Sequence, residues 1–130
     1  MANEPTPVEG PYNCIDMTVA TGTAITQYTV LKMSDPRTGA ASSADGDIFG
    51  GIAMTEKTTT DGVVNMGAAF TGIFVMTDAG AGIAVGARVS LGGANTIKTA
   101  TEAEVALGKD FGVALEAIGA GTTGEVKIWQ

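Results

Sequence analysis

Histidine is absent from the 130-residue chain, and other reactive residues are few. Without histidine, the commonest general base and the commonest nitrogen ligand for metals are missing. The single cysteine, Cys14, excludes an internal disulfide framework, and we predict a small buried apolar thiol rather than a nucleophile. The closest carboxylate pairs, Asp45 with Asp47 and Glu102 with Glu104, are predicted to be solvated turn residues. We therefore expect no catalytic residues, no metal site, no cofactor and no enzyme activity.

Positive charge is also scarce, with 7 lysines and arginines against 14 acidic residues and a net charge of -7. An acidic surface repels nucleic-acid phosphates, and no basic stripe overrides this, so we expect no direct nucleic-acid binding. No apolar run approaches the ~20 residues that cross a bilayer. The N-terminus lacks a basic region followed by an apolar one, which indicates no secretory signal. These features predict a protein made in a cytosol, with no membrane partner.

Glycine, by contrast, is abundant, with 19 residues in the chain. Glycine and threonine are poor helix formers, whereas threonine and valine suit strands. The 45% apolar content is enough to support a core. The composition predicts an all-β fold, a small β-barrel or sandwich of short antiparallel strands with an extended N-terminal arm and at most one short helix.

Apolar runs between turn residues predict where the strands lie. The predicted strands are 12–20, 24–33, 48–54, 63–70, 71–76, 87–91, 96–99, 111–118 and 125–129, with a long polar loop over 34–47 and a hairpin tip at 92–95. The helix candidate begins at Thr101, which can cap it with Glu104, and ends at Gly108, with Val105 and Leu107 facing inward; a loop is the alternative.

Residues 119–124, "GAGTTG", match the dinucleotide-binding pattern G-x-G-x-x-G. In that motif the glycines follow a strand and open a helix whose N-terminus binds the phosphate. Here the next residues are "EVKIWQ", in which Val126 and Ile128 alternate with polar residues at strand period. The segment is therefore predicted to join two strands of a hairpin and not to bind a nucleotide.

The same hairpin has a possible second copy. Both "FGGIAMTEKTTTDGVVNM", from Phe49, and "FGVALEAIGAGTTGEVKIW", from Phe111, run from Phe-Gly through a Thr-Thr turn to a valine strand. Two similar corners of one barrel or sandwich would explain the echo. Chance similarity in a chain rich in Gly, Thr and Ala is the alternative.

The two ends of the chain offer candidate contact residues. Residues 1–13 hold three prolines and are predicted to form an extended arm, either frayed or ordered against a partner, while residues 14–130 form a single β domain. Trp129 shares a strand face with Lys127, opposite Val126 and Ile128, and we expect it at a subunit contact rather than under a second layer. Met54, Met66 and Met76 suit either an interface or a core.

The motifs between residues 24 and 130 resemble those of the small capsid cement (decoration) proteins of tailed bacteriophages. The similar segments are "TVLKM", "GIA", "FTGIFVM", "GIAVGARVSL", "GKDFGVALEAIGAG" and "GEVKIW". The best matches are Gly72-Ile-Phe-Val75, Ile83-Ala-Val-Gly86 with Val89, and Gly112-Val-Ala-Leu-Glu116.

The resemblance implies a structural virion protein, without enzymatic activity, that is made in the host cytoplasm and binds the outer surface of the capsid. It implies bridging between neighbouring capsomers of the major capsid protein, and assembly as a homotrimer. The residues expected to contact the capsid or another subunit are Pro5, Pro7, Pro11, Tyr12 and Trp129. A small carbohydrate-type ligand-binding β-barrel is the alternative, although aromatic residues are only 5% of the chain.

Overall fold

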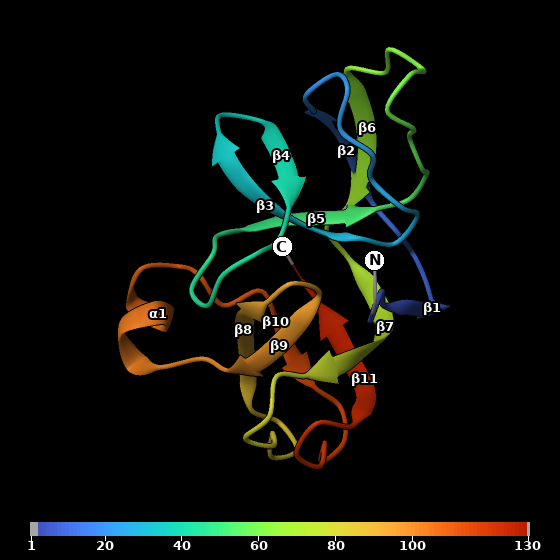
Figure 1. The fold of residues 1–130 in the computed structure, drawn as a ribbon. Helices are drawn as coiled ribbons and strands as arrows, with labels where there is room; N and C mark the ends of the chain where they lie inside the picture. Colours follow the sequence, from blue (N-terminus) through green and yellow to red (C-terminus); the bar gives the residue numbers. More distant parts are fainter. Residues whose placement is uncertain (1–2, 130) are drawn as a thin grey trace.

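The computed structural model describes residues 3–129, which form eleven strands and one short helix (Figure 1). Residues 1 and 2 of the predicted arm, and residue 130, lie outside the described part. The elements are β1 (Thr6–Glu9), β2 (Cys14–Thr18), β3 (Val30–Asp35), β4 (Thr38–Ala41), β5 (Phe49–Ala53), β6 (Asn65–Ala69), β7 (Gly72–Asp78), β8 (Arg88–Gly93), β9 (Thr96–Thr99), α1 (Glu102–Ala106), β10 (Gly112–Ala114) and β11 (Thr123–Ile128). The predicted all-β barrel or sandwich class is confirmed.

The strands close into two small barrels that follow one another along the chain. The first has the order β2-β4-β3-β5-β6. The second belongs to a sheet of order β1-β7-β11-β10-β8-β9, which closes because β7 also pairs with β9. Figure 1 shows the first barrel above the second, with β5 crossing between them.

The two barrels have the same strand order, with β2 to β6 corresponding to β7 to β11. In each barrel the first and third strands pair in parallel, and every other neighbouring pair is antiparallel. Matching isolated bridges join Ile25 to Lys57 and Ile83 to Ile118. The repeated hairpin in the sequence therefore corresponds to a structural repeat, but its two copies belong to two barrels rather than to one.

One hydrophobic core serves both barrels. The Phe-Gly pairs that begin the echoed segments meet there, because the rings of Phe49 and Phe111 stack with centroids 4.1 Å apart and an interplanar angle of 6°. Met66 and Met76 are buried in the same core, so these methionines fill space instead of facing a partner.

The predicted polar loop over 34–47 is wrong in its first half. β3 continues to Asp35, and the chain reverses through Pro36 and Arg37 into β4. Arg37 takes a positive φ of 48°, as Asn95 (φ 57°) does in the corresponding turn of the second barrel. Pairing with β2 and β3 makes a strand of Thr38–Ala41, although glycine and alanine are depleted in strands, so tertiary contacts override local preference.

The predicted helix is confirmed as α1. The side chain of Thr101 accepts a hydrogen bond from the Glu104 backbone N–H, and the Glu104 carboxylate accepts one from the Thr101 N–H. The expectation that Leu107 faces inward is wrong, since 71% of its surface is exposed. Glu104 is buried instead, so the prediction that it is a solvated turn residue is wrong. Its carboxylate accepts a hydrogen bond from the Ser90 hydroxyl and pairs with Lys98.

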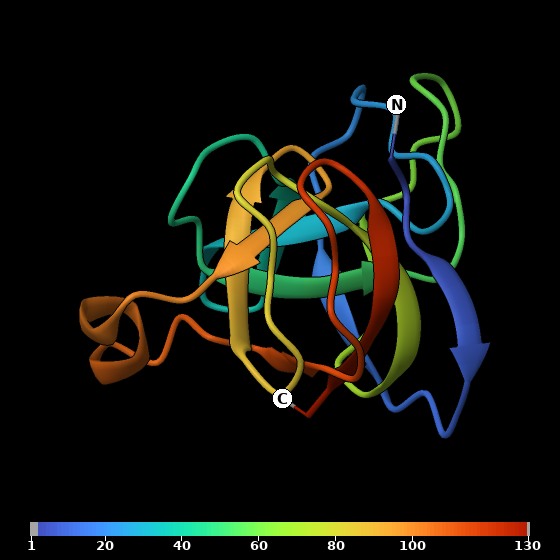
Figure 2. The ribbon, with the colours of Figure 1, turned by 90° about the horizontal axis from the view of Figure 1, so that it is seen from below.

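Part of the N-terminal arm belongs to the second barrel. β1 runs antiparallel along β7, and Figure 2 shows it on the outer side of that strand. Pro7 lies opposite Phe74, whose backbone groups bond to β11, so the missing N–H of the proline costs no hydrogen bond. Nearer the N-terminus, Glu4 accepts a hydrogen bond from the Thr26 hydroxyl of the first barrel. The arm is thus ordered against its own chain and touches both barrels.

Candidate interaction surface

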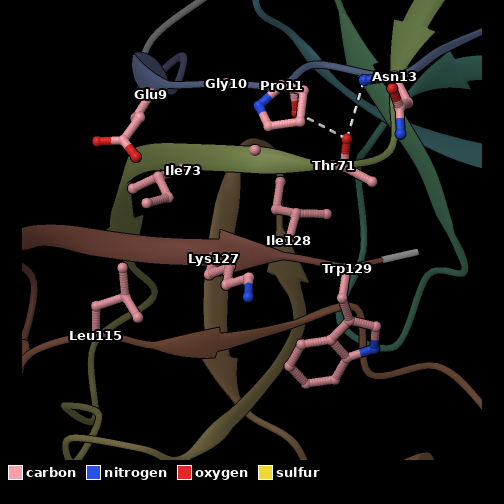
Figure 3. A pocket seen from close by; sticks show the side chains of 11 residues that line it. Glu9, Gly10, Pro11, Asn13, Thr71, Ile73, Leu115, Lys127, Ile128 and Trp129 are labelled. Atoms are coloured by element: carbon pink, nitrogen blue, oxygen red, sulfur yellow. Dashed lines mark hydrogen bonds between the residues drawn. The ribbon is translucent and has the colours of Figure 1, made fainter.

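A groove of about 530 Å³ lies on the outer face of the second barrel, between the arm and the end of β11 (Figure 3). It is lined by Glu9, Gly10, Pro11, Asn13, Thr71, Gly72, Ile73, Leu115, Lys127, Ile128 and Trp129. The arm forms one wall, the start of β7 and the end of β11 form the floor, and Leu115, just after β10, closes the far side. Four segments that are distant in sequence therefore build one surface.

Strand alternation places the floor residues. Val126 and Ile128 are buried in the core, whereas Lys127 and Trp129 point outward, which confirms the face predicted for Trp129. Lys127 lies beside Ile73 of β7. Figure 3 shows its ammonium between that apolar residue and the indole of Trp129. The floor thus combines one positive charge with apolar surface.

Trp129 is the largest exposed apolar side chain in the groove, with 41% of its surface accessible. The guanidinium of Arg88 lies 5.7 Å from the centroid of the indole, which is within the range of a cation–π contact. Arg88 in turn pairs with Asp110 at 3.2 Å. The indole is therefore supported from within the chain while keeping much of its surface free for a partner.

Two hydrogen bonds of the Thr71 hydroxyl hold the arm, which forms one wall of the groove, in place. The hydroxyl donates to the carbonyl of Pro11 and accepts from the N–H of Asn13, both at 2.9 Å (Figure 3). Tyr12 packs against Phe74 with ring centroids 5.3 Å apart. Its ring also covers Gly72, where an added Cβ would come within 2.5 Å of it and the φ is +123°. The groove is therefore preformed and needs little ordering when a partner binds.

The five predicted contact residues separate into two groups. Pro5 is buried, and Pro7 and Tyr12 are half-buried against the chain itself. Pro11 and Trp129 are exposed and line the groove together. Contact of all five with a capsid or subunit stays a prediction, and the geometry favours Pro11 and Trp129.

Of the eleven residues that line the groove, sequence reasoning named Pro11 and Trp129 as contact residues, and the nine that it missed include Leu115 and Lys127. Both follow from one signal, the outward face of the last hairpin, which the alternation of Val126 and Ile128 already marks. Pairing of β7 with β11 and of β10 with β11 brings them beside the arm.

One residue of the glycine-rich segment 119–124, Gly121, helps to hold an anion, the carboxylate of Asp78. One carboxylate oxygen accepts hydrogen bonds from the N–H groups of Gly80 and Gly82 at 2.9 Å and of Gly121 at 3.0 Å. Burial opposes ionisation of Asp78, but these backbone donors outweigh it and hold its pKa below the ordinary value. The segment therefore stabilises a turn.

The cysteine and the closest aspartate pair of the sequence do not form a reactive site. Cys14 is exposed, so its predicted burial is wrong. Asp45 pairs with Lys98, and Asp47 accepts hydrogen bonds from the N–H groups of Ser43 and Ala44, as expected of turn residues. Within residues 3–129, His, Cys, Asp and Glu form no group of three or more that could hold a metal, and no helix is long and apolar enough to cross a membrane.

Comparison with known proteins identifies the fold. No family model and no curated protein matches the chain. Among solved structures, it is similar to the N base of head fiber gp8.5 of bacteriophage phi29, with 18% identity and a TM-score of 0.56. The similarity covers 90% of this chain and 95% of the N-base chain, so the two chains share one fold over nearly their whole lengths.

Proposed function

We propose that the chain is a structural protein of a phage virion, without enzymatic activity, that binds the head. The observation that carries this proposal is the fold shared over 95% of the phi29 head-fiber base. The similarity between the sequence motifs and phage capsid cement proteins supports the same class independently.

The finer proposal is that the protein lies on the outer surface of the capsid and bridges neighbouring capsomers of the major capsid protein. The groove beside Trp129 and Pro11 supplies a preformed contact, which combines apolar area with the positive charge of Lys127 on its floor and the negative charge of Glu9 on the arm. Several modest contacts with a repeating shell act together, so avidity strengthens the attachment without one strong interface. The net charge of -7 suits an exterior position, away from the packaged DNA.

The proposed oligomer is a homotrimer, which would present three grooves to the shell. Light scattering on the free protein measures this state directly. A trimer in solution supports assembly before docking, whereas a monomer that forms trimers only on heads places assembly on the shell.

Co-sedimentation with mature heads that lack the protein tests the proposal. We expect saturable binding at a fixed number of copies per head, and slower loss of shell integrity on heating once the protein is bound. Absence of binding at protein concentrations in the micromolar range would contradict the proposal.

One observation favours a second candidate, a carbohydrate-binding module. The exposed Trp129 ring lies in a groove with polar side chains from Glu9, Asn13 and Lys127, and aromatic faces combined with such groups bind sugars. Titration of the free protein with oligosaccharides, followed by Trp129 fluorescence, separates the two candidates. Tight sugar binding with no affinity for heads would favour the module.

A further inference from the structure

The equivalence of the two barrels reveals an unfilled position in the first. In the second barrel, one edge of β7 is shared by two strands. β9 pairs with the C-terminal part of this edge at Thr77 and Asp78, and β1 pairs with the N-terminal part from Ile73 to Val75. The corresponding strand of the first barrel is β2, whose residues 14–16 are equivalent to 73–75.

Only one of these two pairings exists at β2. β4 pairs with the edge at Thr18, as β9 does at Thr77. Within residues 3–129, no strand pairs with the same edge at residues 14–16, and all three residues are exposed. Ile15 shares a face with the buried Met17, yet 43% of its surface is exposed, whereas the equivalent Phe74 is fully buried.

Hydrogen bonds at both ends of β2 show which backbone groups face this edge. Just after β2, the N–H of Val19 donates to the carbonyl of Val64, which precedes β6, and just before β2, the carbonyl of Asn13 accepts from the N–H of Phe70, which follows β6. Odd-numbered residues of β2 therefore bond to β6, and the groups of Cys14 and Asp16 point to the open edge. The N–H of Thr18 confirms this alternation, because it bonds to the carbonyl of Arg37 in the turn just before β4.

A side chain partly occupies the open edge. The guanidinium of Arg37 donates a hydrogen bond to the backbone carbonyl of Asp16 at 3.0 Å. Arg37 is exposed and lies in the turn between β3 and β4, so its side chain can move away without breaking a strand. The guanidinium thus donates to the Asp16 carbonyl the hydrogen bond that a backbone N–H of a neighbouring strand would otherwise donate.

We propose that the edge of β2 at Cys14–Asp16 accepts an extended segment of the shell protein, which adds as a strand antiparallel to β2. This inference rests on the proposed function and specifies how the protein attaches. The chain's own arm shows what such an edge accepts, since Thr6–Glu9 pairs in this way with β7. A second copy's arm is a poorer occupant, because β1, the Glu4 contact and the Thr71 hydrogen bonds already hold each arm in place.

The edge also determines the chemistry of the incoming segment. It needs backbone N–H groups opposite Cys14 and Asp16, whereas proline is tolerated opposite Ile15, as Pro7 is opposite Phe74. An apolar side chain would cover Ile15. A neutral or basic residue suits the exposed carboxylate of Asp16.

Head binding by backbone and side-chain variants tests the proposal. Asp16→Pro removes an N–H that faces the edge and leaves the bonds of β2 to β6, and Asp16→Ala is the matched control that keeps the N–H. We expect the proline variant to bind heads at least about tenfold more weakly, and the alanine variant to change by less than about threefold. Equal binding by the wild type and the proline variant would overturn the proposal.

Arg37→Ala gives a result of opposite sign and keeps the test valid if the proline variant does not fold. Freeing the Asp16 carbonyl should strengthen head binding by about two- to fivefold, because the incoming strand no longer displaces the guanidinium. Weaker binding by this variant would contradict the proposal.

Cys14 is a built-in reporter of occupancy. We expect a maleimide to label it readily in the free protein and at least about tenfold more slowly on heads, because the added strand covers it. An unchanged labelling rate on heads would overturn the proposal while leaving head binding itself established. Protection already present in a free oligomer would mean that a second copy fills the edge, and would also overturn it.

Discussion

Asp78 is the anion that one glycine of the segment after residue 118, Gly121, binds together with Gly80 and Gly82. Backbone N–H groups of a glycine-rich turn bind anions readily, and here the anion is supplied by the chain itself. The sequence pattern identified the donor loop correctly as a hairpin connection. It could not identify the acceptor, because Asp78 lies 43 residues from Gly121 along the chain.

Asp78 should make stability depend on acid pH. Its pKa is held below the ordinary value, so the folded state binds fewer protons than the unfolded state as the pH approaches the unfolded pKa of about 3.9. This contribution is present above about pH 4 and is lost as the pH falls through the lower folded pKa. Urea unfolding between about pH 7 and pH 3 measures it.

Asp78→Asn should lower the free energy of unfolding at neutral pH by about 1–3 kcal/mol and reduce its further loss in acid. Asp35→Asn, at an exposed position, is the control and should leave both quantities close to wild type. If the Asp78 variant lost as much free energy of unfolding in acid as the wild type, other carboxylates would produce the pH dependence.

Trp129 is the residue on which the groove's proposed role depends most. Tryptophan in the centre of an interface commonly contributes 2 kcal/mol or more, so Trp129→Ala should weaken head binding by at least about tenfold. Leu107→Ala, at a more exposed apolar residue that caps the C-terminus of helix α1 and does not line the groove, is the control for general loss of surface hydrophobicity. An equal loss in both variants, measured by co-sedimentation, would contradict the assignment of the groove.

At the scale of elements, β1 converts a proline-rich terminus into part of the sheet. Removing residues 1–10 should lower stability by about 1–3 kcal/mol, because the edge of β7 and part of Phe74 lose their cover. We also expect weaker head binding, since one wall of the groove is lost.

In the truncated protein, amide hydrogen exchange rates should alternate from residue to residue along β7. The N–H groups of Ile73 and Val75 face β1 and should exchange faster, whereas those of Phe74 and Met76 bond to β11 and should stay protected. Uniform loss of protection along β7 would mean that the truncation unfolds the barrel instead of removing one strand.

Elements that carry their own local signals were predictable from the sequence. The capping pair Thr101 and Glu104 gave the helix, and alternation gave the outward face of β11. β1 and β4 lack such signals, since one contains proline and the other follows a polar turn. Both are strands because an edge of β7 or of β2 and β3 is available to pair with them, which no local pattern can reveal.

At the scale of the whole molecule, the repeat was visible in one hairpin only. Phe49 and Phe111 matched in sequence, but the remaining strands have diverged, and only pairing shows that both halves share one order. The groove was predictable to the extent of Pro11 and Trp129. Its other residues come together through the pairing of β1 with β7, of β7 with β11 and of β11 with β10.

The shared core predicts that the two barrels unfold together. Phe111→Leu removes the stack on Phe49 and should lower the free energy of unfolding by about 1–2 kcal/mol. The fluorescence of Trp129, the single tryptophan, reports on the second barrel, and far-ultraviolet circular dichroism reports on both. The two urea transitions should coincide in the wild type and shift together in the variant, whereas separate transitions would contradict a common core.

Cryo-electron microscopy of the virion tests head attachment most directly. Maps of wild-type virions and of virions lacking this protein should differ by density on the outer head surface that fits the double barrel, with the Trp129 groove and the β2 edge turned toward the shell. Identical head surfaces in the two maps, or extra density confined to the tail or the interior, would contradict the account.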